Sequence, residues 1–416
     1  MMIYNISDRP PFGKNLLFSL QLVLACFVAT CLIAQICGVS AAAALVGAGI
    51  GTIFYLIITN FKSPMYISSS GAFVAPVLAA LTLGGYTGAA IGGVISCIVY
   101  CILGYIFSKV DVDNIYKIFP KTLIGAITAV IGINLMPFCL TYVQIAGQTS
   151  IWGIVIAFIT MVAIALISQY AKGLGKILPF LLGTLIGYGV AIILTLTGIY
   201  PIVDFNVFQN LKLFAVPDFG FFHFSTISWS AILSIIILYI VYTVSASMEL
   251  LSDHAALGAI IGTDLYRNPG LSKIYFGEGA ANLVNSLFSG LGSCSYGEGI
   301  STVGFSKVAS TWTTLWAAII MIVLGFFGPV QALIASIPSC VFCGAALILY
   351  GFIACSGIKM LQQVDLNNNK NITIVSVVLS LGISGIAIGG TTFTLSGVAL
   401  ALIAGVVLNL ILKNKN

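Results

Sequence analysis

Charge is what this sequence has least of. Only 6% of its 416 residues are Asp, Glu, Lys or Arg, and just two are histidines. Soluble domains carry about 25% charged residues. Meanwhile 60% of the residues are hydrophobic, and mean hydropathy is +1.14. The composition therefore excludes a soluble globular domain and predicts an all-α polytopic membrane protein, because apolar runs of about 20 residues, the length that crosses a bilayer, recur along the chain.

Motifs for metal, cofactor or covalent chemistry are also lacking. The ten cysteines lie mostly inside apolar runs, and Cys340-Val-Phe-Cys343 has no second cysteine pair or histidine to complete a metal site. There is no set of nucleophile and base at membrane depth and no soluble ATP-binding domain. We therefore expect no catalytic residues, no metal and no cofactor. An ion gradient is the remaining energy source for a transporter of this kind.

Fourteen membrane segments can be read from the apolar runs. Segments three and ten are too short or too rich in Gly and Ser to form complete helices. The predicted segments are 16–37, 41–60, 65–79, 83–108, 118–139, 151–171, 177–199, 228–253, 270–290, 293–307, 310–335, 339–360, 371–388 and 394–412.

The distribution of basic residues supports this number of segments. Cytoplasmic ends and loops of membrane proteins are enriched in Lys and Arg. With both termini in the cytoplasm, all but one of the 16 basic residues fall on the inner side, and Lys212 is the exception. Adding or removing one segment would destroy this bias. The inner set comprises Arg9, Lys14, Lys62, Lys109, Lys117, Lys121, Lys172, Lys176, Arg267, Lys273, Lys307, Lys359, Lys370, Lys413 and Lys415.

A long outer loop, residues 201–227, divides the chain into two halves of seven segments, 1–200 and 228–416. An odd number of segments per half makes the halves inverted repeats, as in many secondary transporters. Sequence echoes seven segments apart agree: "PKTLIGAITAVIG" in segment five resembles "PSCVFCGAALILYG" in segment twelve, and "SSSGAF" in segment three resembles "SCSYGE" in segment ten. Segments three and ten are thus corresponding interrupted elements. Such breaks line the substrate sites of transporters.

Four acids lie at or near membrane depth, where an ionisable group is costly and suggests function. Glu249 and Asp253 are four residues apart and share one helical face, although a polar stripe can also hold helices together. Glu278, between two glycines, can equally be a structural hydrogen-bonding group. Glu298 coincides with the break in segment ten. His223 and His254 receive no role.

A cavity shared by Glu249 and Glu298 would have a particular chemistry. Two carboxylates in poorly solvated surroundings repel, so at least one should hold a proton near neutral pH, and such a group can carry a proton across the membrane. Carboxylates accept hydrogen bonds from ring N–H groups, and the backbone N–H groups at the breaks donate to ring carbonyls. A neutral planar ring with both features, such as a nucleobase, fits this cavity. Inorganic anions fit less well, since no basic residue lies at that depth.

Motifs along nearly the full length resemble the nucleobase–ascorbate transporter family, which contains the bacterial uracil and xanthine permeases. These are "RPPF", "MYISSSGAFVAPV", "IFPKTLIGAITAVIG", "DLYRNPGL", "SYGEGI", "LILYGFIACSGIKML" and "VDLNNNKNITIVSVVLSLGISG". The resemblance implies a proton-coupled nucleobase symporter, often homodimeric, with fourteen segments in two inverted repeats and short central strands in segments three and ten. It also implies a core domain of segments 1–4 and 8–11 and a gate domain of segments 5–7 and 12–14.

The same resemblance implies roles for individual residues. Glu249 matches the base-binding glutamate of segment eight that is linked to protonation, and Asp253 one turn further along is assigned to the same proton coupling. Glu298 matches the segment-ten glutamate of uracil-type members. The remaining implied substrate-binding residues are Tyr296, Gly297, Ala72 and Phe73.

Departures from the family pattern leave alternatives open. Segment one has Gln21-Leu22 where Gln-His is usual, and Asp253 stands where uracil-type members often have histidine. An aspartate there is typical of purine carriers, so a xanthine or other purine symporter is the alternative to a uracil symporter. An anion exchanger or channel on a similar fold is a further alternative, and would have a basic or uncharged centre.

Overall fold

The computed structural model describes residues 2–110, 120–145, 148–176, 178–209, 211–386, 388–390, 393–395 and 397–412. Lys117, Lys413 and Lys415 of the inner basic set lie outside these residues. The described helices are α1 (Phe12–Cys37), α2 (Ala41–Ile58), α3 (Val74–Lys109), α5 (Lys121–Leu135), α6 (Ile151–Tyr170), α7 (Pro179–Leu196), α8 (Trp229–Ile261), α9 (Leu271–Ser289), α10 (Gly297–Ser306), α11 (Thr311–Phe326), α12 (Gly328–Ser336), α13 (Ser339–Leu361), α14 (Asn369–Ile383) and α15 (Gly397–Ile411).

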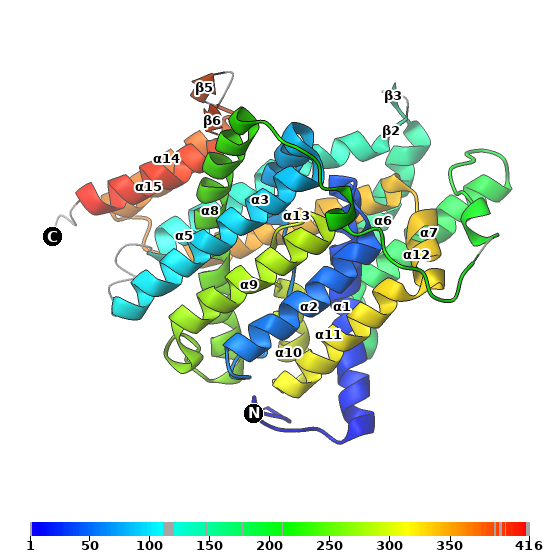
Figure 1. Ribbon diagram of the computed structural model, residues 1–416, viewed down its shortest axis with the longest axis horizontal. Coiled ribbons are helices and arrows are strands. Elements are labelled where there is room, and N and C mark those ends of the chain that lie inside the picture. The colour runs from blue at the N-terminus through cyan, green and yellow to red at the C-terminus, as the bar shows by residue number, and fades with distance from the viewer. Residues whose placement is uncertain are drawn as a thin grey trace.

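Short strands interrupt this helical architecture. Within the described part of the chain three antiparallel pairs form, β1 with β4, β2 with β3, and β5 with β6. Only the pair β1–β4 joins segments that are distant in the sequence, while the other two are local hairpins near the top of Figure 1. The strands are β1 (Ile67–Ser69), β2 (Gln144–Ile145), β3 (Gln148–Thr149), β4 (Ser293–Ser295), β5 (Ile388–Gly390) and β6 (Phe393–Leu395).

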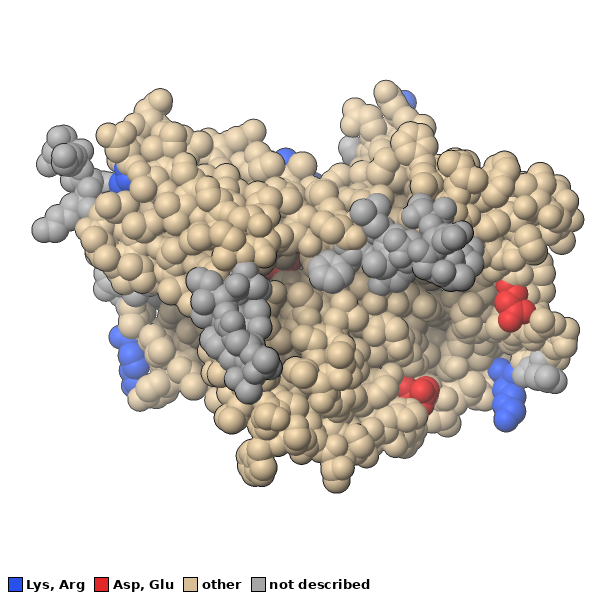
Figure 2. All heavy atoms as spheres, turned by 90° about the horizontal axis from the view of Figure 1, so that it is seen from above, with Lys and Arg blue, Asp and Glu red and all other residues tan. Residues whose placement is uncertain are grey.

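The predicted all-α membrane fold, with short central strands in segments three and ten, is confirmed. Among the described residues, seven helical stretches are long and apolar enough to cross a membrane. The outer surface fits a lipid environment, because charged side chains are few on the face in Figure 2 and many large apolar side chains are exposed. The seven stretches are Phe12–Cys37, Ala41–Ile58, Gly71–Lys109, Ile151–Tyr170, Pro179–Leu196, Trp229–Ile261 and Ser339–Leu361.

Two segment boundaries differ from the sequence prediction. Segments three and four run together as α3, which bends at Gly84 and Gly85; Gly85 has φ +57°, a conformation that residues with a Cβ rarely adopt. Segment eleven, predicted as a single span, is two helices. α11 ends at Phe326 and α12 starts at Gly328, followed by Pro329, which cannot continue the hydrogen-bond ladder of α11.

The helices pack in two groups. α1, α2, α3, α8, α9, α10 and α11 contact one another around the β1–β4 pair, and α5, α6, α7, α13, α14 and α15 form the second group. Fewer contacts join the two groups. Among them, α1 contacts α7 and α5 contacts α8. The core and gate domains that the family resemblance implies, and motion between them, stay predictions.

Glycine allows the backbones of α5 and α13 to touch. A Cβ on Gly132 would lie 2.4 Å from the backbone nitrogen of Ala354, and a Cβ on Gly357 would lie 2.4 Å from that of Ala129. Small residues at such contacts permit the close van der Waals packing that holds membrane helices together. These helices carry the two echoed sequences of segments five and twelve, so the repeats meet face to face here.

Replacing Gly132 by Ala should therefore destabilise the protein. The new methyl group must push α5 and α13 apart, at a cost of about 1–3 kcal/mol. Thermal unfolding of the purified protein in detergent measures the effect. Gly351→Ala on α13 is the matched control, because a Cβ there meets nothing within 4 Å. Equal melting temperatures for the two variants would contradict the close α5–α13 contact.

Candidate functional site

The β1–β4 pair lies at the centre of the first helix group. Its register places Ile67 opposite Ser295 and Ser69 opposite Ser293, and all six strand residues are buried. Three residues per strand cannot satisfy all of their own backbone groups. At membrane depth no bulk water replaces the missing partners, so neighbouring side chains must supply them.

Polar side chains from the surrounding helices supply these hydrogen bonds. On α2, the Thr52 hydroxyl donates to the Ile67 carbonyl at 2.8 Å and accepts from the Ile67 N–H at 3.1 Å. On α9, the Asn282 amide donates to the Ser293 carbonyl at 2.9 Å. On α1, the Thr30 hydroxyl bonds a side chain of β1 instead of its backbone, the Ser68 hydroxyl, at 2.7 Å. Each half of the chain thus contributes one strand and part of its support.

A helix N-terminus follows the second strand. α10 begins at Gly297 directly after β4 and Tyr296, and the Tyr296 side chain makes no capping hydrogen bond. The first N–H groups of a helix have no partner within the helix, so they can donate to a ligand. A Cβ on Gly297 would meet nothing within 4 Å, which shows that this first turn faces open space.

That open space is a cavity of about 420 Å³, within the size range of small-ligand pockets. Five of the seven predicted site residues line it: Glu249 and Asp253 from α8, and Tyr296, Gly297 and Glu298 from the end of β4 and the start of α10. The charged residues in its described lining are all acidic.

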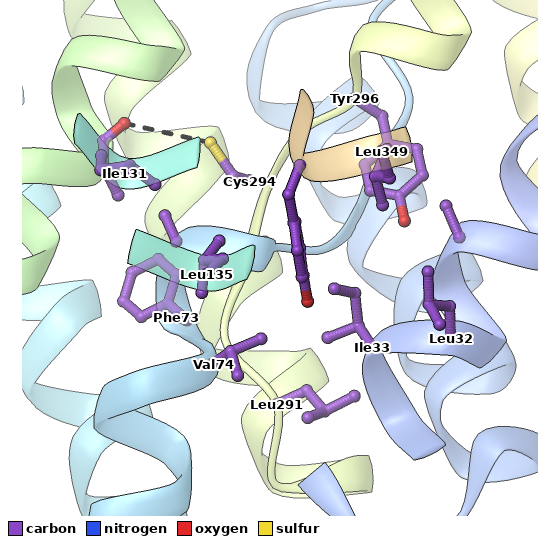
Figure 3. Packing of buried hydrophobic residues seen from close by; sticks show 14 of the residues in the cluster. Leu32, Ile33, Phe73, Val74, Ile131, Leu135, Leu291, Cys294, Tyr296 and Leu349 are labelled. Atoms are coloured by element: carbon purple, nitrogen blue, oxygen red, sulfur yellow. Dashed lines mark hydrogen bonds between the residues drawn. The ribbon is translucent and has the colours of Figure 1, made fainter. Parts of the chain in front are cut away.

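Ala72 and Phe73 lie one turn away from this lining. Both are buried, and the cavity instead borders Ser69, Ser70 and Gly71, which precede them. The short turn η1 (Gly71–Phe73) directs the Phe73 ring toward Gly292 and toward Tyr239, with ring centroids 6.2 Å apart. Figure 3 shows Phe73 in the buried hydrophobic cluster, and its part in substrate binding stays a prediction.

The acids of the cavity interact with one another. Glu298 sits in the first turn of α10, where the helix dipole stabilises negative charge. Glu249 is partly buried, its Oε2 atom has no hydrogen-bond partner, and it interacts electrostatically with Glu298. Asp253 lies near the Ser295 hydroxyl and interacts with both. Three acids that share one cavity repel one another unless a proton or a ligand separates them.

Glu278 is placed differently. It lies on α9, is completely buried, and does not line the cavity. Neither of its carboxylate oxygens makes a regular hydrogen bond, although they face the Cys294 thiol and the backbone of Ser295. Glu278 therefore sits behind the strand pair, within electrostatic range of Glu249 and Asp253.

The second helix group closes the cavity with residues that the sequence analysis did not single out. Leu349, Phe352 and Ile353 of α13 provide an apolar wall, and Figure 3 shows Leu349 with Tyr296. Hydroxyl groups complete the lining. The sequence could have pointed to these hydroxyl residues, because they are polar residues inside apolar runs. They are Thr128, Ser168, Ser252, Ser301, Thr302 and Ser356.

The sequence is similar to those of known permeases along nearly its full length. The Permease family model, named for xanthine and uracil permeases, matches residues 13–391. The uracil permease of Bacillus caldolyticus is 33% identical over 421 residues, covering 99% of this chain and 95% of that protein. The uracil permease of Escherichia coli K12 is 34% identical over 419 residues, covering 98% and 93%.

Solved structures share the fold at much lower identity. The transmembrane domain of the cyanobacterial bicarbonate transporter BicA superposes with a TM-score of 0.67 at 18% identity, covering 97% of this chain and 99% of that one. SLC26A9 gives 0.68 at 12% identity, covering 96% and 65%. Two inverted seven-segment repeats are therefore the fold of this chain, and these two structures carry no information about its substrate.

Thr52→Val should loosen the central strand. The substitution keeps the shape but leaves the N–H and C=O of Ile67 without their partner, at a cost of about 1–3 kcal/mol for each buried group. We expect a lower melting temperature and faster hydrogen exchange in the peptide around β1. Thr184→Val is the control, because that buried hydroxyl has no partner. Unchanged exchange around β1 in Thr52→Val would show that the hydroxyl does not support the strand.

Proposed function

The chain belongs to the xanthine/uracil permease family, and we propose that it is a proton-coupled symporter that imports uracil across the cytoplasmic membrane. As a permease it is a transporter and not an enzyme. The observation that carries the proposal is the cavity in which Glu249 and Glu298 meet an uncapped helix N-terminus. Both termini would lie in the cytoplasm, as the basic residues suggest.

Uracil offers two ring N–H donors and two carbonyl acceptors. Glu249 and Glu298 approach the cavity from α8 and α10 and would each accept one ring N–H. The free N–H groups at the start of α10, beginning with Gly297, would donate to a ring carbonyl. The apolar wall of Leu349 and Phe352 suits the faces of the ring. Each polar edge of the base thus meets a group of opposite hydrogen-bonding character.

The proton would bind to the acids of α8. Glu249 and Asp253 lie one helical turn apart, and each interacts unfavourably with Glu298 when all are ionised. Adding one proton relieves that repulsion and supplies a hydrogen-bond donor beside the base. Binding of the base and of the proton would then favour each other, which is the thermodynamic requirement for symport.

Movement of the first helix group against the second would carry the loaded site across the membrane. The acids and the strand pair belong to the first group, whereas α13 covers them from the second. A shift at this boundary would expose the cavity alternately to each side, as in other inverted-repeat transporters.

A purine such as xanthine is the second candidate substrate, and Asp253 is the observation that favours it, because an aspartate at this place is typical of purine carriers in the resemblance described above. An anion is disfavoured by the acidic lining of the cavity. Bicarbonate transport by the BicA protein, named in the comparison, belongs to that protein and is not transferred by fold alone.

Uptake of radiolabelled uracil into proteoliposomes tests the proposal. We expect uptake to accelerate when the outside is made acidic relative to the inside, and unlabelled uracil to compete more strongly than xanthine, guanine or adenine. Gradient-independent uptake by the intact carrier would eliminate proton coupling. Strong competition by xanthine and weak competition by uracil would instead assign a purine substrate.

Glu298→Gln tests the binding role of the acid on α10. The amide keeps the size of the side chain but loses the charged acceptor, so affinity for uracil should fall by about tenfold to a hundredfold. Equilibrium binding of labelled uracil to the purified protein measures this loss. Asp204→Asn, in the exposed outer loop, should bind normally. Wild-type affinity in Glu298→Gln would remove Glu298 from the site.

A further inference from the structure

The segment ahead of α1 lies across the turn that joins α10 to α11. This segment, residues 3–9, is called the inner strap below, and Figure 1 shows the N-terminus at the lower edge of the molecule, next to the start of α11. The Ile3 N–H donates to the Lys307 carbonyl at 2.7 Å, and the Ala309 N–H donates to the Tyr4 carbonyl at 2.9 Å. The strap therefore pairs with the turn through the backbone, in the manner of a short parallel bridge.

Side chains of the same turn also bind the inner strap. Ser310 occupies the N-cap position of α11, but its hydroxyl donates to the Asp8 carbonyl at 2.6 Å instead of capping that helix. The N–H and the hydroxyl of Thr311 both donate to the Ile6 carbonyl, at 3.1 Å and 3.0 Å. Ser310 and Thr311 are buried, so water cannot easily replace a bond that is lost here.

A second segment makes corresponding contacts in the other half of the chain. Residues 220–227, ahead of α8, are called the outer strap below, and they lie across the bend of α3. The Thr87 hydroxyl donates to the Ser225 carbonyl at 2.9 Å and accepts from the Ser225 N–H at 2.7 Å. Ile227 packs so closely on Gly84 that a Cβ there would clash with its side chain. The outer strap is thus fixed to the bend as the inner strap is fixed to its turn.

The two straps follow the inverted repeat. Each precedes the first segment of one half and binds the turn after the interrupted segment of the other half. The two turns share a left-handed residue, since Gly85 has φ +57° and Lys307 has φ +59°. In both turns a hydroxyl shortly after that residue, from Thr87 or Ser310, donates to a strap carbonyl. The same contact arises twice from different residues, so it belongs to the architecture and not to one local sequence.

α10 connects the inner strap to the cavity. Its 10 residues are too few for a helix that is stable on its own, so its position depends on what holds its ends and its back. At its start the Tyr296 N–H donates to the Tyr66 carbonyl at 3.1 Å, and at its end lies the turn that the inner strap binds. Its cavity-lining residues run from Gly297 to Phe305. A short helix moves as a unit, so a displacement of its far end would displace Glu298.

We infer that the inner strap positions Glu298 for the base, and that it acts through α10. None of residues 3–9, all of which the structure describes, lines the cavity, so these are positioning residues and not binding residues. The β1–β4 pair holds the near end of the interrupted segment, and the strap holds its far end. The inference rests on the proposed binding of uracil at Glu298.

A double-mutant cycle separates positioning from general structural support. Ile3→Pro removes the N–H that bonds the Lys307 carbonyl, and Ser310→Ala removes the hydroxyl that bonds the strap. Each is made in the full-length protein, alone and together with Glu298→Gln. Equilibrium binding of labelled uracil and the melting temperature are measured for every variant. Ser150→Ala is the matched control, because it removes an N-cap hydroxyl from α6 in the second helix group.

We expect each strap variant to weaken uracil binding about threefold to tenfold, as for loss of one hydrogen bond. Together with Glu298→Gln, each should weaken binding by less than about twofold further, because the group that the strap positions is already changed. Ser150→Ala should lower the melting temperature and leave the affinity unchanged.

Wild-type affinity in both strap variants would overturn the inference. Equal losses with and without Glu298→Gln would also overturn it, since they mark a general structural role. If Glu298→Gln alone binds uracil as the wild-type protein does, or if the wild-type protein does not bind uracil, the proposed function fails at its site, and the inference fails with it.

Discussion

The requirement that every backbone group at membrane depth find a hydrogen-bond partner governs the centre of this protein. Two strands of three residues meet there, and helices on either side complete their bonding through Thr52 and Asn282. Non-helical backbone in this position requires specific polar side chains on the neighbouring helices α2 and α9. In return, the chain gains a place where a helix can begin in the middle of the membrane and present free N–H groups.

The acids owe their positions to this arrangement. Glu298 occupies the first turn of the half-helix that the strand makes possible, and Glu249 and Asp253 reach the same cavity from the continuous helix α8. The acids of the cavity therefore come from two elements of the first helix group, α8 and α10. The second helix group contributes mainly shape, through the apolar wall of α13.

Much of the membrane fold and of the acidic cavity could be predicted from the sequence. The length of the apolar runs, the distribution of basic residues and the acids inside apolar runs each depend directly on the position of the chain in the membrane. The interruption in segments three and ten followed from residue types, and the shared cavity of Glu249 and Glu298 was a supposition that the family resemblance supported. The direction of the Phe73 ring did not follow from the sequence, because it depends on a single short turn. Pro329 ends the hydrogen-bond ladder of α11, but the contact that the break makes with the outer loop, where the Gly328 N–H bonds the Leu213 carbonyl, could not be predicted. Such details arise from contacts between distant segments, which local patterns do not encode.

The origin of the two central strands also bears on biosynthesis. β1 belongs to the first half of the chain, and its partner β4 is not made until residues 293–295 leave the ribosome. Until then the first half lies in the bilayer with an open strand edge that only water or another protein can satisfy. Insertion of the early segments therefore cannot complete their folding, because the central strand pair forms only after residues 293–295 are made.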